Sequence, residues 1–72
     1  MKIKNLYNCN SINPYMVAEM EDGSLKCARK YNGKLVLSHD FQTTGLTKKD
    51  LIPMPDWEYN FFYKHLINAY NA

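Results

Sequence analysis

Long apolar runs are missing from this chain, and so is a recognisable export signal. The longest uninterrupted apolar stretches span only a few residues, such as Leu35-Val36-Leu37 and Leu66-Ile67, whereas a transmembrane helix needs about 20. Lys2 and Lys4 are not followed by the apolar segment that a signal peptide would have. We therefore expect no contact with a membrane and a cytoplasmic location.

Cysteine is also scarce, with only Cys9 and Cys27 present. Small secreted domains that depend on disulfides usually contain more cysteines than this. Structural zinc sites pair their ligands at close spacing, and Cys9, Cys27, His39 and His65 are not paired in that way. We therefore predict no disulfide, no metal and no cofactor.

Neither charge nor catalytic motifs point to a specific chemistry. Nine basic and seven acidic residues give a formal net charge of +2, which is too weak to require a nucleic-acid partner and excludes an acidic mimic of DNA. No Gly-x-Ser-x-Gly motif, carboxylate pair or glycine-rich phosphate loop occurs. Ser38-His39-Asp40 would alternate between the two faces of a strand, so these residues cannot form a relay. We predict that the protein is not an enzyme.

What is present is a globular composition with an unusual bias. The 72 residues are 46% hydrophobic and 22% charged, which is typical of one small folded domain. Lysine and asparagine occur eight times each and tyrosine six times, whereas Arg29 is the single arginine. The abundant residues have A/T-rich codons, and A/T-rich genomes include those of many bacteriophages and low-GC bacteria. The bias therefore favours a phage-encoded protein.

The chain divides into a β-rich part, residues 1–52, and a helix, residues 55–70. Strands are expected at residues 2–7, 15–20, 25–30 and 34–39, and residues 46–52 suit either a short turn or a fifth strand. Asp22-Gly23 and Asn32-Gly33 are strong hairpin signals. The sequence predicts a single α+β domain over residues 1–72, in which a small antiparallel sheet of three to five strands packs against one C-terminal helix.

The two hairpins cannot both have two-residue loops if one face of the sheet is to be apolar. A two-residue Asp22-Gly23 loop places Ala18 opposite Cys27. A two-residue Asn32-Gly33 loop would then place Leu35 on the other face from Cys27. A three-residue loop, Tyr31-Asn32-Gly33, with Gly33 in the left-handed conformation, removes this conflict. We therefore predict one buried face made of Met16, Ala18, Met20, Leu25, Cys27, Leu35 and Leu37.

The order of these elements resembles the layout of SH3-like and Tudor-like small barrels. The likeness consists of a strand, a hairpin, a further strand and then the short apolar segment Leu51-Ile52-Pro53. Tudor domains carry an aromatic cage on nearby loops, and no matching cage is found in this sequence. The resemblance therefore concerns layout alone and assigns no family.

The helix contains the strongest functional signal. At about 100° per residue, a broad apolar arc should pack on the sheet, and it consists of Tyr59, Phe62, Tyr63, Leu66, Ile67, Ala69 and Tyr70. Trp57 and Phe61 lie outside this arc as i, i+4 neighbours, together with Lys64 and His65. Either the Pro53–Pro55 segment or the N-terminal strand covers Trp57, or the pair contacts a partner, because tryptophan is enriched among binding hot spots. The sequence predicts a partner-binding surface of Trp57, Phe61, Lys64 and His65.

Three functions remain open at this point. The favoured one is a small protein-binding module, a phage-type accessory protein that binds a host protein in the host cytoplasm and modulates or inhibits it. The alternative is a small nucleic-acid-binding domain that uses Lys26, Lys30, Tyr31 and Lys34 on the outer sheet face. The third is a structural homodimer formed through the helix.

Overall fold

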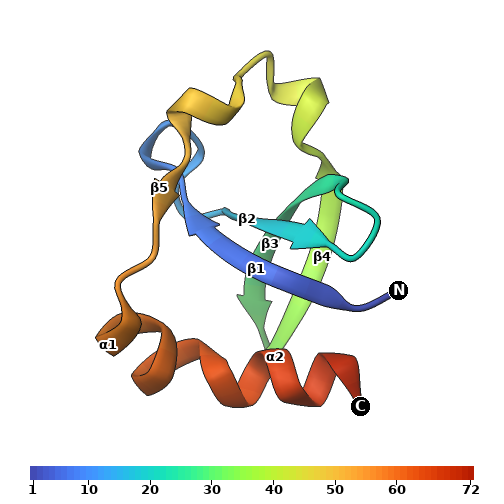
Figure 1. Ribbon diagram of the computed structural model, residues 1–72, viewed down its shortest axis with the longest axis vertical. Coiled ribbons are helices and arrows are strands. Elements are labelled where there is room, and N and C mark those ends of the chain that lie inside the picture. Colours follow the sequence, from blue (N-terminus) through green and yellow to red (C-terminus); the bar gives the residue numbers. More distant parts are fainter.

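A computed structural model describes residues 1–72, and it confirms the predicted α+β class (Figure 1). One antiparallel sheet has the strand order β4-β3-β2-β1-β5. Its strands are β1 (Ile3–Asn8), β2 (Met16–Met20), β3 (Leu25–Tyr31), β4 (Lys34–Asp40) and β5 (Ile52–Pro53). No pairing joins β4 to β5, so the sheet is open and both strands lie at its edges.

The chain between β4 and the helix settles the choice left open for residues 46–52. Two short 3-10 turns, Phe41–Thr44 and Lys48–Asp50, follow β4, and a third, Asn10–Ile12, links β1 to β2. The chain then returns to the sheet, where the two-residue β5 pairs with Tyr7 and Asn8 of β1. Both a turn and a fifth strand are therefore present.

The C-terminal helical segment runs across one end of the sheet (Figure 1). It consists of α1 (Asp56–Glu58), a π-helical turn (Tyr59–Tyr63) and α2 (Lys64–Asn71). Pro55 precedes the first helical residue, where its fixed φ and missing N–H are tolerated. None of the helical segments combines the length and apolar character that crossing a bilayer requires.

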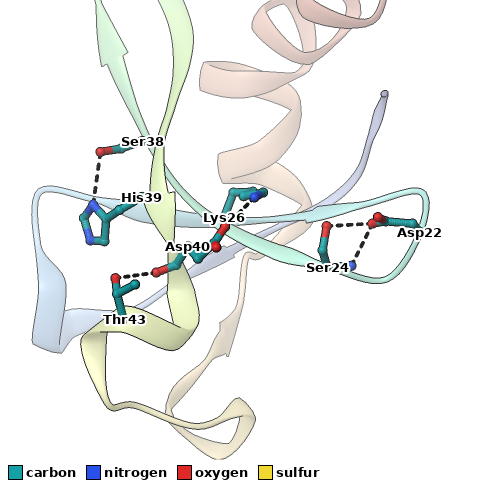
Figure 2. A network of polar contacts seen from close by, with 7 residues as sticks. All are labelled: Asp22, Ser24, Lys26, Ser38, His39, Asp40 and Thr43. Carbon is teal, nitrogen blue, oxygen red and sulfur yellow. Dashed lines mark hydrogen bonds and ion pairs between the residues drawn. The ribbon is translucent and has the colours of Figure 1, made fainter.

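The hairpin at Asp22-Gly23 has a three-residue loop, which corrects the predicted register. Glu19 pairs with Leu25, and Val17 pairs with Cys27. The Met20 N–H donates to the Ser24 carbonyl oxygen at 2.8 Å, and Gly23 has φ +88°. The Asp22 carboxylate accepts bonds from the backbone N–H and the hydroxyl of Ser24, which fixes the loop (Figure 2).

The hairpin at Asn32-Gly33 has the two-residue loop instead. Tyr31 pairs with Lys34, and Ala28 pairs with Leu37. Asn32 and Gly33 have φ values of +53° and +75°, as a type I′ turn requires. The predicted left-handed Gly33 is confirmed, but the odd-numbered loop lies in the other hairpin.

The corrected register divides the predicted apolar face between the two sides of the sheet. Leu35 lies on the side that the helix covers, whereas Cys27 and Leu25 lie on the opposite side. The prediction that these three residues share one face was therefore wrong. The helix-covered core consists of Ile3, Leu6, Met16, Ala18, Met20, Ala28, Leu35, Leu66 and Ile67. The loop-covered core consists of Cys9, Val17, Cys27 and Phe41.

Two asparagine side chains, one on the helix and one on β1, connect the helix to β1 through hydrogen bonds. The Asn71 side chain accepts a bond from the Ile3 N–H at 2.8 Å and donates one to the Ile3 carbonyl oxygen at 3.0 Å. At the other end of the helix, Asn8 Nδ2 donates to the Glu58 carboxylate at 3.1 Å. The helix is therefore held at both ends, and its orientation decides which of its side chains face solvent.

Candidate functional site

Three aromatic side chains form the most exposed apolar surface of the helix. Trp57, Phe61 and Phe62, which we call the aromatic patch, are exposed by 67%, 76% and 42%. A soluble monomer seldom exposes large apolar side chains side by side without a use for them. The exposure of Trp57 and Phe61 agrees with the predicted position of this pair outside the sheet-facing arc.

The three rings contact one another edge to face. The ring centroids of Phe61 and Phe62 are 4.8 Å apart, with an interplanar angle of 70°. Those of Trp57 and Phe62 are 6.5 Å apart, with an angle of 67°. Edge-to-face pairs are a favoured aromatic geometry. Phe62 therefore joins the other two rings into one continuous surface.

Phe62 was expected to face the sheet, and that prediction was wrong. It lies in the π-helical turn Tyr59–Tyr63, in which one extra residue per turn changes the angular positions of the side chains. Tyr59, Tyr63, Leu66 and Ile67 pack against the sheet. Phe62 lies beside this stripe and faces solvent, as do Ala69 and Tyr70.

The opposite side of the same turn is anchored in the protein. Tyr59 and Tyr63 are half-buried and pack on the helix-covered core. Burial raises the pKa of the Tyr63 hydroxyl, and the nearby negative charge of Glu58 raises this pKa further. Because the inward tyrosines are held, the outward rings of the aromatic patch are carried on a fixed backbone.

Lys64 and His65 follow the aromatic patch directly, at the start of α2. Both side chains are exposed, and neither takes part in an ion pair or a side-chain hydrogen bond of the structure. They lie three and four residues after Phe61, which places them about one turn along the helix from that ring. The predicted partner-binding residues are therefore neighbours on one helix.

The four residues of the nucleic-acid alternative are not brought together. Side chains alternate along a strand, so Lys26 and Lys30 belong to one side of the sheet and Tyr31 to the other. Lys34 pairs with Tyr31 and shares its side. Lys26 is also bound to the carboxylate of Asp40 (Figure 2), and this bond is the main cause of the raised pKa of the Lys26 ammonium group.

The largest surface depression, about 420 Å³, contains that ion pair. It lies between the Asp22-Gly23 loop and the start of the segment after β4, and its polar lining includes Ser24, Gln42 and Lys48. His39 Nδ1 lies 3.1 Å from the Ser38 hydroxyl, but the Asp40 carboxylate binds Lys26 (Figure 2). Ser38, His39 and Asp40 therefore do not form a chain of hydrogen bonds.

The two cysteines lie together in the loop-covered core. Both are free, buried thiols, and Cys27 is completely inaccessible to solvent. Burial raises the pKa of the Cys27 thiol, with smaller contributions from Cys9 and Asp40. No three histidine, cysteine or acidic side chains gather in a way that could hold a metal ion.

Comparison with known proteins found no relative of this chain. No family model, no curated protein and no solved structure matches the chain. The side chains of the molecule itself are therefore the only guide to its function.

Proposed function

We propose that this protein is a protein-binding module that docks on another protein through the aromatic patch. The supporting observation is the continuous exposure of Trp57, Phe61 and Phe62 on a helix fixed at both ends. Aromatic residues are enriched in the cores of protein interfaces, and tryptophan is among the commonest hot-spot residues. The mode of action is stoichiometric binding, without a catalytic step.

The arrangement of the rings favours binding energetically. Each ring has few rotatable bonds, and its neighbours limit it further through the contacts at 4.8 Å and 6.5 Å. Less side-chain entropy is therefore lost on binding than for long flexible residues. Lys64 and His65 supply polar contacts at the rim, where an interface is usually hydrated.

The partner in this proposal is a host protein, bound in the host cytoplasm by a phage-type accessory protein. The source is suggested by the lysine-, asparagine- and tyrosine-rich composition. Binding modulates or inhibits the host protein by covering a surface that the host itself uses. A helix that presents apolar side chains to a groove is a common mode of recognition.

The test is affinity capture from lysate of a candidate bacterial host, read by quantitative mass spectrometry. Wild-type protein, Phe61→Ala and Tyr70→Ala are immobilised in parallel, because Tyr70 is an exposed aromatic residue near the far end of the same helix. We expect a host protein that wild type and Tyr70→Ala retain equally and that Phe61→Ala loses. A partner retained equally by all three proteins would show that binding does not use the aromatic patch.

Salt dependence and molecular mass then distinguish protein binding from the two other functions, which are nucleic-acid binding and homodimerisation. Binding through apolar rings should persist between 50 and 200 mM salt, whereas binding to phosphates weakens steeply over this range. A homodimer formed through the helix would show a concentration-dependent mass in sedimentation equilibrium, and Phe61→Ala would abolish it.

A further inference from the structure

Arg29 occupies a position on the sheet that sequence reasoning did not single out. In the observed register it pairs with Val36 of β4, and alternation along β3 places it on the same side as Cys27, away from the helix. The loop-covered core ends at Cys27, so Arg29 and Val36 remain exposed. The sheet surface around Arg29 and Val36 is therefore exposed to solvent.

Two tyrosine rings hold the guanidinium group of Arg29. Its central carbon lies 5.2 Å from the ring centroid of Tyr31 and 6.0 Å from that of Tyr15. Both distances are within the range of cation–π attraction. The two rings restrict the side chain, and a guanidinium stacked on a ring keeps the N–H donors at its edge available.

These donors have no acidic partner in the protein. The single ion pair of the structure joins Lys26 to Asp40, and Arg29 makes no side-chain hydrogen bond. An arginine that is positioned by aromatic rings but lacks an anion has a geometry suited to binding a phosphate from outside.

Further side chains extend the same surface on both sides. Lys34 lies opposite Tyr31 in the β3–β4 ladder and shares its side of the sheet. At the other end, the His39 ring contacts Tyr15 edge to face, with centroids 5.6 Å apart. The irregular pairing between Lys26 and Ala28 falls opposite this part of β4. The result is a row of His39, Tyr15, Arg29, Tyr31 and Lys34.

We infer that this row binds single-stranded nucleic acid, with Arg29 on a backbone phosphate and Tyr31 under a base. Tyr31 is 54% exposed, so its ring offers area to an incoming base. Stacking on an aromatic ring requires an unpaired base, because the faces of a paired base are covered by its neighbours in the duplex. Lys34 contacts the next phosphate, and the row lies on the opposite side of the sheet from the helix.

The test is fluorescence anisotropy with a labelled 15-nucleotide single strand of mixed sequence, as DNA and as RNA, and with the matching duplex. Arg29→Gln and Tyr31→Ala are each expected to weaken single-strand binding by about fivefold or more, as for loss of one phosphate or stacking contact. Lys49→Gln is the control, because it removes one charge from an exposed residue of the Lys48–Asp50 turn. Arg29→Lys keeps the charge but loses the planar fork, and it should also weaken binding.

The outcomes distinguish a specific binding site at Arg29 from non-specific attraction of nucleic acid to positive charge. Tighter binding of a single strand than of the duplex, lost in Arg29→Gln and kept in Lys49→Gln, would support the inference. Equal losses of single-strand binding in Arg29→Gln and Lys49→Gln would overturn it. So would single-strand binding by Arg29→Lys and Tyr31→Ala that is as tight as that of wild type. Absence of binding by wild type at 50 mM salt would also overturn it. Circular dichroism melts of each variant check that the fold is intact.

Discussion

The two sides of the sheet are covered in different ways, and each leaves a different surface bare. The helix covers one side with two buried residues, Leu66 and Ile67. The segment after β4 covers the other side mainly with Phe41. A chain of 72 residues cannot cover both sides completely. Arg29 lies on the sheet where the loop cover ends, and the aromatic patch lies on the outer face of the helix, where no further part of the chain packs on it.

The largest expected effect tests whether the smaller core is as necessary as the larger one. Phe41→Ala should lower the free energy of unfolding by about 3–5 kcal/mol, because it leaves a cavity among Val17, Cys9 and Cys27. Leu66→Ala, on the helix side, should cost about 2–5 kcal/mol. Urea unfolding measures both, and the exposed neighbour Gln42→Ala should remain within about 0.5 kcal/mol of wild type.

If Phe41→Ala lowered the free energy of unfolding by less than about 1 kcal/mol, the loop-covered core would not be as necessary for stability as the helix-covered core. This result would mean that residues 41–51 only lie on the sheet and do not stabilise it. The helix-covered core would then be the sole source of stability.

The second prediction concerns the two-residue turn between β3 and β4. The length of this turn determines which side chains of β4 face the helix. Gly33→Val should cost about 2 kcal/mol, because a β-branched residue resists the φ of +75° that the type I′ turn requires. An added Cβ would meet no atom within 4 Å, so the cost comes from the backbone alone. Gly33→Asn should be nearly neutral, because asparagine tolerates the left-handed region. Thermal melts that place both variants equally far from wild type would show that φ is not the cause.

The same hairpins show how far the sequence could be interpreted. Strand positions and both turn sites were predictable, because alternation and Asn-Gly or Asp-Gly pairs are local signals. The need for one odd-numbered loop was also predictable. Its place was not, because Ala28 and Cys27 are both small and apolar, and either could face the helix. In the observed register Cys27 lies in the loop-covered core together with Phe41, which is distant in sequence, and Ala28 lies in the helix-covered core.

The candidate surfaces show the same limit. Trp57 and Phe61 were predictable from helical spacing alone. Phe62 was not, because the π-helical turn changes the angular period within the helix. Arg29 was missed for a different reason. The predicted register placed Arg29, like Leu25 and Cys27, on the side that the helix covers, and therefore on the other side of the sheet from Tyr15.

The third prediction uses the thiol at the centre of the loop-covered core. The raised pKa of Cys27 means that the folded state favours the protonated thiol. The stability that this provides is complete below the unfolded thiol pKa of about 8.5 and is lost as pH rises through the folded pKa. Melting temperatures from pH 7 to pH 10 should therefore fall more steeply for wild type than for Cys27→Ala. Tyr63 remains in both proteins and serves as an internal reference. Parallel curves would show that the pKa of the Cys27 thiol is the same in the folded and unfolded states.

The last prediction has the smallest expected effect on stability and the greatest bearing on function. Phe61 is 76% exposed, so Phe61→Ala should change the free energy of unfolding by no more than about 0.5 kcal/mol. The same variant should weaken partner binding by about 2 kcal/mol or more if this ring is a hot spot. A core residue would show the reverse pattern, as Leu66→Ala should. Melting curves and partner affinity measured on the same preparation decide the matter, since a variant that unfolds while its folded fraction binds normally would place Phe61 in the core. Unchanged single-strand binding by Phe61→Ala would further show that the two bare surfaces act independently.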